Sequence, residues 1–336
     1  MNEKKRKSRR RRKAENRMIL TIIIAAAVAI AAVILVNQRS RNSNYNTSVS
    51  GDEVDQEVTY NGDTYHYNNH LSNYLFMGID TMDHVKTYVG RANAGQADAL
   101  FLVSVNRQDG TVKCITIPRD TMTEIETFSL DGESLGKSVD HISLSYAYGD
   151  GYFKSCRLTK DAVSNLFHKI PIQGYCSITR GSIAQLAEAL GDITVTVPNE
   201  SLVTVDSQFQ PGAQVTLNAD NTETFLHYRD VDLSQSALGR QERHVTYLKA
   251  VMARVKEKTA EDSGYISDLY TQMKEQMVTN MESDNFAEIA ENLTDDYDNE
   301  IVTVPGQGGE GVAFDEYYVD DDALEKLIID TFYIKN

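Results

Sequence analysis

An unbroken apolar run over residues 18–36 constrains this chain more than any other stretch. It reads M-I-L-T-I-I-I-A-A-A-V-A-I-A-A-V-I-L-V, which is 19 residues with one threonine and no charged side chain. A helix that rises about 1.5 Å per residue would span roughly 28 Å here, close to the thickness of a bilayer's hydrocarbon core. Buried helices of soluble domains are seldom so uniformly apolar. The run therefore predicts one transmembrane helix.

The flanks of the run favour an uncleaved anchor over a cleaved signal peptide. The run is longer than a usual signal core, and Val36-Asn37-Gln38-Arg39 offers no small-x-small cleavage site. Residues 1–17 hold ten Lys or Arg against two Glu, a net +8, so the other residues must carry −24 to reach the total of −16. The positive-inside rule keeps this basic tail cytoplasmic and places residues 37–336 outside a single-pass membrane protein. A basic tail alone could be a nucleic-acid arm, but the anchor accounts for its charge, and we expect no nucleic-acid partner.

Alternating strand and helix patterns beyond residue 68 predict an α/β sandwich. Residues 37–68 are polar, which indicates a linker, and Asn61-Gly62 within it predicts a short hairpin. The short turn between Ala99–Val105 and Val112–Ile117 predicts two antiparallel neighbouring strands. Further strands are expected at Asn73–Ile79, Gly174–Ile178 and Ile193–Val197, helices at Ser155–Phe167, Arg180–Leu190, Leu238–Val255 and Tyr265–Met281, and loops at Thr123–His141 and Pro305–Gly311. These patterns predict a main domain over residues 69–255 and an acidic C-terminal part, residues 256–336, packed on it.

The first candidate chemistry lies where one predicted strand ends, in V-K-C-I-T-I-P-R-D-T-M over Val112–Met122. Pro118 lacks a backbone donor, so the strand stops there and delivers Arg119 and Asp120 onto a loop. Loops at the carboxyl ends of strands are where open α/β sheets build their sites, and the arginine fork fits phosphate oxygens. A surface ion pair that closes a turn is the alternative.

Other charged residues could complete such a site. Asp80 follows one strand and Asp98 precedes the next, and two carboxylates that flank a loop could hold Mg²⁺. Arg240 and Arg243 are three residues apart on a predicted helix, hence on one face, and Arg229 precedes a polar loop. The alternative for the helical pair is a solvated charged face.

Several classes of protein receive no support. The sequence contains no G-x-S-x-G, H-E-x-x-H, Walker lysine or dinucleotide-binding motif. Cys114, Cys156 and Cys176 are too few and too scattered for a disulfide framework or a C-x-x-C metal site. The cysteine pattern favours three small buried side chains, and a single extracellular disulfide is the alternative.

Seven sequence blocks, in this order, resemble the LytR-CpsA-Psr family of envelope proteins over roughly residues 70–255. They are Phe76–Asp80 (F-M-G-I-D), Gln96–Val105, Ile115–Thr121 (I-T-I-P-R-D-T), Ser145–Gly149 (S-Y-A-Y-G), Ile170–Ile178, Leu190–Pro198 and Gly239–Arg243 (G-R-Q-E-R). I-P-R-D-T after a strand is the most specific block.

The resemblance implies an α/β/α sandwich with a central mixed sheet, behind one transmembrane helix, and an apolar pocket for a lipid tail. It implies a membrane-anchored phosphotransferase that moves a glycopolymer phosphate, such as teichoic acid or capsule, from a polyprenyl-pyrophosphate carrier to peptidoglycan, with Mg²⁺ or Mn²⁺. By motif, Asp98 matches the acidic residue of the family's Arg-Ser-Asp-Thr block, and together with Asp80, proposed from its position at a strand end, it would hold the metal. The implied catalytic residues are Asp98, Arg119, Arg229, Arg240 and Arg243, and the implied substrate contacts are Arg119, Asp120, His227, Arg229 and Arg240.

The sequence departs from the family pattern at positions that bear on activity. His227 stands where the family commonly has the first arginine of an R-x-R pair, and Gln96-Ala97 replaces Arg-Ser. These losses motivate a second hypothesis, a weakly catalytic relative that binds lipid-linked intermediates or scaffolds the envelope machinery. The basic tail and the family's older naming raise a third, a transcriptional attenuator. Convergence of the arginines and aspartates on one pocket mouth would favour the enzyme over the scaffold.

Overall fold

The computed structural model describes residues 56–293 and 301–336. The expected basic tail at 1–17, the expected transmembrane helix at 18–36 and the linker up to residue 55 lie outside the described residues. Within the described part, no helix combines the length and the apolar character that a membrane crossing requires.

A mixed sheet forms the centre of the described structure, with six strands in the order β11-β8-β3-β4-β5-β12. Their bounds are Met277–Thr279 (β11), Gly174–Thr179 (β8), Leu71–Ile79 (β3), Ala97–Asn106 (β4), Val112–Ile117 (β5) and Ile301–Thr303 (β12). The β4–β5 pair is antiparallel, as its short connecting turn predicts. The β3–β8 and β5–β12 pairs are parallel. The expected central mixed sheet is confirmed.

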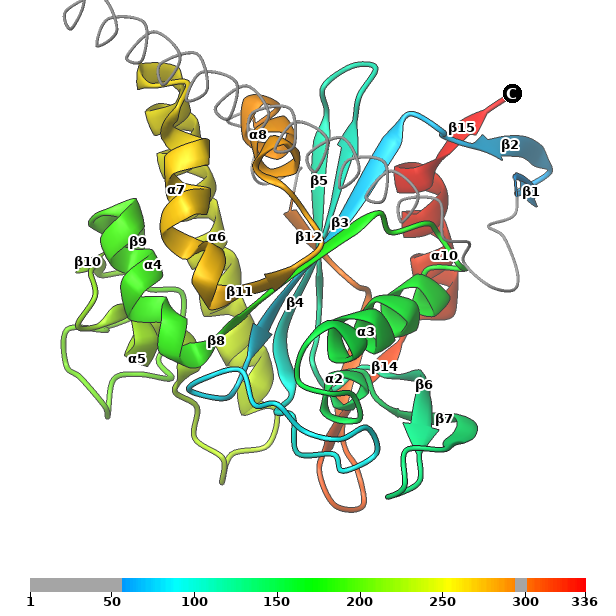
Figure 1. Cartoon of the computed structure of the whole chain (residues 1–336), viewed down its shortest axis with the longest axis horizontal. Helices are drawn as coiled ribbons and strands as arrows, with labels where there is room; N and C mark the ends of the chain where they lie inside the picture. Colours follow the sequence, from blue (N-terminus) through cyan, green and yellow to red (C-terminus); the bar gives the residue numbers. More distant parts are fainter. Residues whose placement is uncertain (1–55, 294–300) are drawn as a thin grey trace, which may run out of the picture. The chain divides into compact units, whose positions relative to one another are not determined.

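Helices cover both faces of this sheet, which makes three layers (Figure 1). The strands are apolar on both faces because alternate residues face opposite layers. In β4, Leu100 and Leu102 pack toward α2, α3 and α10, whereas Val103 and Val105 pack toward α6 and α8. The helices are α2 (Leu144–Ala147), α3 (Phe153–Leu166) and α10 (Asp321–Phe332) on one face, and α6 (Ser236–Glu261), α7 (Tyr265–Met273) and α8 (Ser283–Glu291) on the other.

A separate apolar cluster joins α6 to a small two-stranded sheet at one side of the molecule. Its residues come from β9 (Ile193–Thr196), β10 (Gln214–Leu217), α4 (Ile183–Leu190) and α5 (Thr222–His227), among others. A turn of 3-10 helix, η1 (Arg180–Ser182), precedes α4. The expected strand at Ile193–Val197 therefore exists, but it pairs with β10 and does not join the central sheet.

The two ends of the described chain meet in a small sheet, β1-β2-β15. Asn61 and Gly62 both have positive φ, 51° and 87°, which is the backbone that a two-residue hairpin turn requires. The hairpin predicted around Asn61-Gly62 is confirmed. Bounds are Glu57–Tyr60 (β1), Asp63–Tyr67 (β2) and Tyr333–Lys335 (β15).

Three local expectations were wrong. The polar stretch Thr123–His141 forms a hairpin of β6 (Met122–Phe128) and β7 (Ser134–His141). Most of β7 faces solvent, so its sequence lacks the apolar alternation that would have predicted a strand. The glycine-rich stretch after Pro305 forms β13 (Gly306–Glu310), paired with β14 (Asp315–Val319). The helix expected over Tyr265–Met281 ends at Met273, and after the 3-10 turn η2 (Lys274–Gln276) the chain forms β11 at the edge of the central sheet.

Residues beyond 255 belong to the same folded unit as the main domain. Helix α6 crosses residue 255 without interruption, and β11 and β12 occupy the two edges of the central sheet. The described residues, 56–293 and 301–336, form one compact unit. The three cysteines are buried and free, as their scattered positions favour.

Candidate active site

Four segments place charged side chains at one end of the central strands, where β3, β5 and β8 finish and β4 begins. β3, β5 and β8 run in the same direction, since β3 is parallel to β8 and two antiparallel pairings lead from β3 to β5. Asp80 follows β3, Arg119 follows β5 after Pro118, and Arg180 follows β8. Asp98 lies at the start of the antiparallel strand β4, so it reaches the same end. The topology therefore gathers these side chains where α/β sheets place ligands.

A cavity of about 390 Å³ opens at this end of the strands, between the sheet and helices α4, α6, α7 and α8. Its charged lining residues, together with one of its histidines, lie where the central strands end and at the nearby ends of α5 and α6. They are Asp80, Asp98, Arg180, His227 and Arg240. The rest of the wall is mainly apolar and includes Phe76, Phe101, Val103, Leu186, Leu248, Met252, Leu269, Met273, Phe286 and Leu293. The cavity thus joins a charged mouth to an apolar interior.

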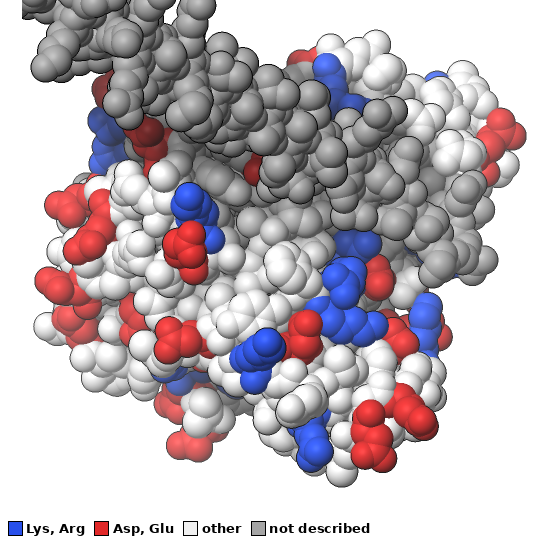
Figure 2. Space-filling model, in the orientation of Figure 1, with Lys and Arg blue, Asp and Glu red and all other residues white. Residues whose placement is uncertain are grey.

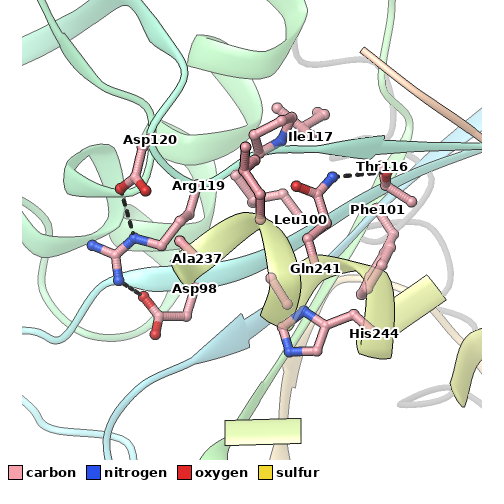
Figure 3. A pocket seen from close by; sticks show the side chains of 13 residues that line it. Asp98, Leu100, Phe101, Thr116, Ile117, Arg119, Asp120, Ala237, Gln241 and His244 are labelled. Carbon is pink, nitrogen blue, oxygen red and sulfur yellow. Dashed lines mark hydrogen bonds and ion pairs between the residues drawn. The ribbon is translucent and has the colours of Figure 1, made fainter. Parts of the chain in front are cut away.

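Asp98 is the shared acceptor of two arginines that arrive from different elements. Nη1 of Arg119 donates to Oδ1 of Asp98, and Nη1 of Arg240 lies 2.8 Å from its Oδ2. Arg119 also donates through Nε to Oδ1 of Asp120 at 3.0 Å and through Nη2 to the side chain of Gln96. Figure 3 shows Arg119 held between the two aspartates beside the first turns of α6. The carboxylates fix the arginine forks in place, which is the arrangement that bidentate phosphate contacts need.

Arg240 has a buried donor without a partner. Its side chain is only 3 % exposed, and its Nη2 makes no hydrogen bond among the described residues. Burial lowers the pKa of Arg240, while the charge of Asp98 acts in the opposite direction and favours the guanidinium. Buried donors are almost always satisfied in folded proteins. An orphaned guanidinium nitrogen on a residue that lines a cavity is therefore evidence for a ligand with an oxygen acceptor there.

Asp80 is held beside the same mouth by the loop that returns to β4. Its Oδ1 accepts from the backbone N–H of Gln96 at 2.7 Å. Gly95 makes this approach possible: it has a φ of +88°, and a Cβ there would lie 2.8 Å from that same oxygen. Burial raises the pKa of Asp80, and the negative charge of Asp98 adds to the increase. The two carboxylates therefore repel each other, and a cation between them would remove that repulsion.

This pair fits the donor set expected for Mg²⁺ or Mn²⁺. Among residues 56–293 and 301–336, no three His, Cys, Asp or Glu side chains cluster as a complete metal site. Mg²⁺ commonly takes one or two carboxylates and fills its other positions with phosphate oxygens and water. Asp80 and Asp98 would supply the protein's share of such a site.

Four of the predicted residues do not line this cavity. Arg119 and Asp120 line a smaller neighbouring pocket that also contains Asp98, and Arg229 and Arg243 line neither. Arg229 donates through Nη1 to Ser236 Oγ at 3.4 Å, and its charge contributes to the lowered pKa of Arg240. Arg243 is fully buried and donates to the backbone carbonyls of Phe225 and Tyr228 and to the hydroxyl of Ser201. Its fork ties α6 to the segment that carries His227 and Arg229, so the structure places it behind the mouth.

We expect Arg243→Met to destabilise the protein strongly. The substitution keeps much of the volume but leaves several buried acceptors without a donor, and hydrogen bonds to a charged group contribute about 1.5–3 kcal/mol each. A loss of about 3 kcal/mol would lower the melting temperature by roughly 6 °C or more, measured by circular dichroism. Arg254→Met is the control, because Arg254 is on the same helix with its side chain 28 % exposed. If Arg243→Met melts normally yet fails to bind ligand, Arg243 has a direct role in ligand binding and the structural assignment is wrong.

Sequence reasoning missed two parts of this site. Arg180 stands in an ordinary strand-to-helix connection, and no local pattern marks it. Helices α7 and α8, which wall the cavity, come from the stretch beyond residue 255 that was expected only to pack on the domain. Recognising either requires the pairing of β8 with β3 and of β11 with β8, which local periodicity does not specify.

Comparison with known proteins gives the same answer as the motifs. Curated relatives called polyisoprenyl-teichoic acid–peptidoglycan teichoic acid transferase TagU include one from Bacillus cereus strain AH820, 28 % identical over 240 residues, which covers 69 % of this chain and 71 % of the relative. Another, from Halalkalibacterium halodurans, is 30 % identical over 179 residues, which covers 53 % of this chain and 51 % of the relative.

Solved structures share the fold. TagV of B. subtilis superposes with a TM-score of 0.60 at 22 % identity and covers 78 % of this chain and 95 % of that one. A structure described as TagT bound to LI-WTA gives 0.56 at 18 % identity, with coverage of 84 % and 96 %. The family model described as the LytR_cpsA_psr family matches residues 32–330. The chain therefore belongs to the LytR_cpsA_psr family.

Proposed function

We propose that this protein is a membrane-anchored transferase that moves a glycopolymer phosphate, such as teichoic acid or capsule, from a polyprenyl-pyrophosphate carrier to peptidoglycan. The single observation that carries the proposal is the cavity: its charged mouth suits the pyrophosphate and its apolar interior suits the lipid chain. The names of the TagU relatives support the same donor and acceptor. The apolar run at 18–36 would hold the domain beside the membrane that contains the carrier.

Local charge distinguishes the mouth from the rest of the protein. The chain carries 49 Asp and Glu against 33 Lys and Arg. Figure 2 shows acidic and basic side chains interspersed over one face of the molecule, separated by broad uncharged areas. Arg119 and Arg240 instead share Asp98 as a partner, and Arg180 and Arg240 line the same cavity, so a pyrophosphate there would find cations from three separate segments.

Two arginines and two aspartates at the mouth have roles in the proposed transfer. An acceptor hydroxyl oxygen forms a bond to the phosphorus that carries the glycopolymer, the bond from that phosphorus to the polyprenyl phosphate breaks, and the hydroxyl proton passes to solvent. Arg119 and Arg240 donate to the phosphate oxygens and stabilise the charge that develops during displacement. Asp98 keeps both forks oriented, and Asp80 and Asp98 would hold Mg²⁺ or Mn²⁺. When bound, the ion neutralises phosphate charge and aligns the reacting groups.

The test uses the full-length protein in detergent. We expect mass spectrometry of the purified protein to find a retained polyprenyl phosphate or pyrophosphate. Given a short-chain polyprenyl-pyrophosphoryl sugar and peptidoglycan fragments, the protein should transfer the sugar phosphate with Mg²⁺. Chelation by EDTA should reduce transfer by about a hundredfold or more, the range seen when electrostatic stabilisation of a transition state is lost, and added Mg²⁺ should restore it.

The outcomes separate the competing hypotheses. Full transfer in EDTA would contradict the metal assignment while leaving the transferase intact. Tight binding of the lipid pyrophosphate without transfer to any acceptor would favour the binding or scaffold protein. Absence of both lipid and transfer would reject the proposed function.

A further inference from the structure

Arg180 occupies a fixed position at the mouth of the cavity. Its backbone N–H donates to the carbonyl of Thr81 at 3.0 Å, which joins the end of β8 to the loop after Asp80. Gly181 permits this contact, because a Cβ at that position would lie 1.9 Å from the carbonyl oxygen of Met82. The side chain of Arg180 lines the cavity together with Asp80, Asp98, His227 and Arg240.

Arg180 is paired less closely with a carboxylate than Arg119 and Arg240 are, since its only ion pair among the described residues, with the half-exposed Glu223, is long. Its Nη1 lies 2.6 Å from Nε2 of His227, its Nη2 and Nε lie 3.1 and 3.3 Å from the thioether sulfur of Met82, and Glu223 is 3.5 Å from Nε. A thioether is a poor acceptor, and an imidazole that accepts from a guanidinium carries no charge of its own. Arg180 thus retains donors that a stronger acceptor could take.

His227 is suited to orient this guanidinium. Burial lowers its pKa, and the neighbouring charges of Arg180 and Arg240 lower it further, so the ring is neutral at pH 7 and its Nε2 accepts from Arg180. Position 227 is also where the family pattern has an arginine. In this chain a guanidinium from the end of β8 lies directly against the side chain at 227.

We propose that Arg180 is a substrate-binding residue for the pyrophosphate, and that it supplies from β8 the positive charge that residue 227 supplies in the family pattern. His227 is its positioning residue. The inference rests on the proposed function, and it adds a residue that the family motifs do not contain. It also explains how the loss of an arginine at 227 is compatible with an active site.

The experiment measures binding by calorimetry to the full-length protein in detergent with Mg²⁺. The probes are geranylgeranyl pyrophosphate and, for the lipid part alone, geranylgeraniol. We expect Arg180→Leu to weaken binding of the pyrophosphate by about tenfold, within the range for one charge-assisted contact, and to leave geranylgeraniol unchanged. Arg254→Leu is the matched control, because both arginine side chains are 28 % exposed and Arg254 lies outside the cavity lining.

The decisive variant removes the guanidinium at position 180 and places one at position 227. Arg180→Leu combined with His227→Arg should bind geranylgeranyl pyrophosphate to within about threefold of the wild type. If Arg180→Leu does not fold, Arg180→Gln keeps a polar side chain of similar reach and should show the same selective loss.

Two results would overturn the inference while leaving the proposed function in place. One is pyrophosphate binding by Arg180→Leu within twofold of the wild type. The other is an equal loss for pyrophosphate and alcohol, which would assign Arg180 a structural role. If the wild-type protein binds no geranylgeranyl pyrophosphate, the proposed function fails, and this inference fails with it.

Discussion

Replacing Asp98 with alanine is expected to abolish transfer and to destabilise the protein in the same step. Asp98 is the acceptor for both Arg119 and Arg240, and it is one of the two proposed metal ligands. Its loss leaves the buried Arg240 without a counter-charge, and breaking a buried pair in this way costs about 3–5 kcal/mol. Transfer should fall by about a thousandfold or more, the upper end of what one electrostatic group contributes to a transition state.

A second substitution separates the two effects. Asp98→Asn keeps the size and an acceptor oxygen, so it should recover part of the stability but not the transfer, because the carboxylate charge is what the metal and both arginines need. Asp109→Ala is the control, since Asp109 lies in the turn at the opposite end of β4 and β5. Metal-dependent transfer by Asp98→Ala above a tenth of the wild-type rate would contradict the assignment.

Replacing Arg119 with alanine is expected to lower kcat by about ten- to a few hundred-fold with little loss of stability. A charge-assisted contact contributes roughly 1.5–3 kcal/mol, each factor of ten in rate corresponds to about 1.4 kcal/mol, and a contact that strengthens in the transition state is lost mainly from kcat. Asp98 keeps Arg240 as its partner in this variant, so no buried charge is left alone. Arg119→Lys should rescue poorly, because an ammonium cannot reproduce the bidentate fork.

The measurement is single-turnover transfer from a short-chain polyprenyl-pyrophosphoryl sugar, with circular dichroism melting as the control for folding. Arg107→Ala serves as the matched variant, because Arg107 follows the other end of β4 and its side chain donates to the backbone carbonyls of Asn69 and His70. A variant Arg119→Ala that melts normally and transfers at the wild-type rate would make the scaffold hypothesis the better one.

The sequence predicts the part of this site that depends on local pattern. A β-branched strand that ends at Pro118 leaves Arg119 and Asp120 on a loop, and the short turn between β4 and β5 brings Asp98 beside them. Arg240 follows from a short motif at the start of α6. Arg119 and Asp120 are therefore placed by local features, whereas Arg240 is identified through the family resemblance.

What could not be predicted depends on long-range pairing and on burial. Spacing three apart places Arg240 and Arg243 on one side of α6. Arg240 nevertheless lines the cavity and pairs with Asp98, whereas Arg243 donates to the backbone carbonyls of Phe225 and Tyr228. Arg180 reaches the mouth only because β8 is parallel to β3. The polar hairpin β6–β7 has too few buried residues to show the alternation that reveals a half-buried strand.

The pairing of late strands with early ones has a consequence for biogenesis. β5, which leads into the loop of Arg119, is bordered on one side by β12, and β15 pairs with β2 near the start of the described chain. A polypeptide that crosses the membrane from its N-terminal side would present β5 as an uncovered edge until residues 301–303 emerge, and such edges recruit other chains. Native contacts of such long sequence separation also slow folding. Completion of the central sheet therefore has to wait for residues 301–303, and until then the exposed edge of β5 is where the folding chain is most prone to aggregate.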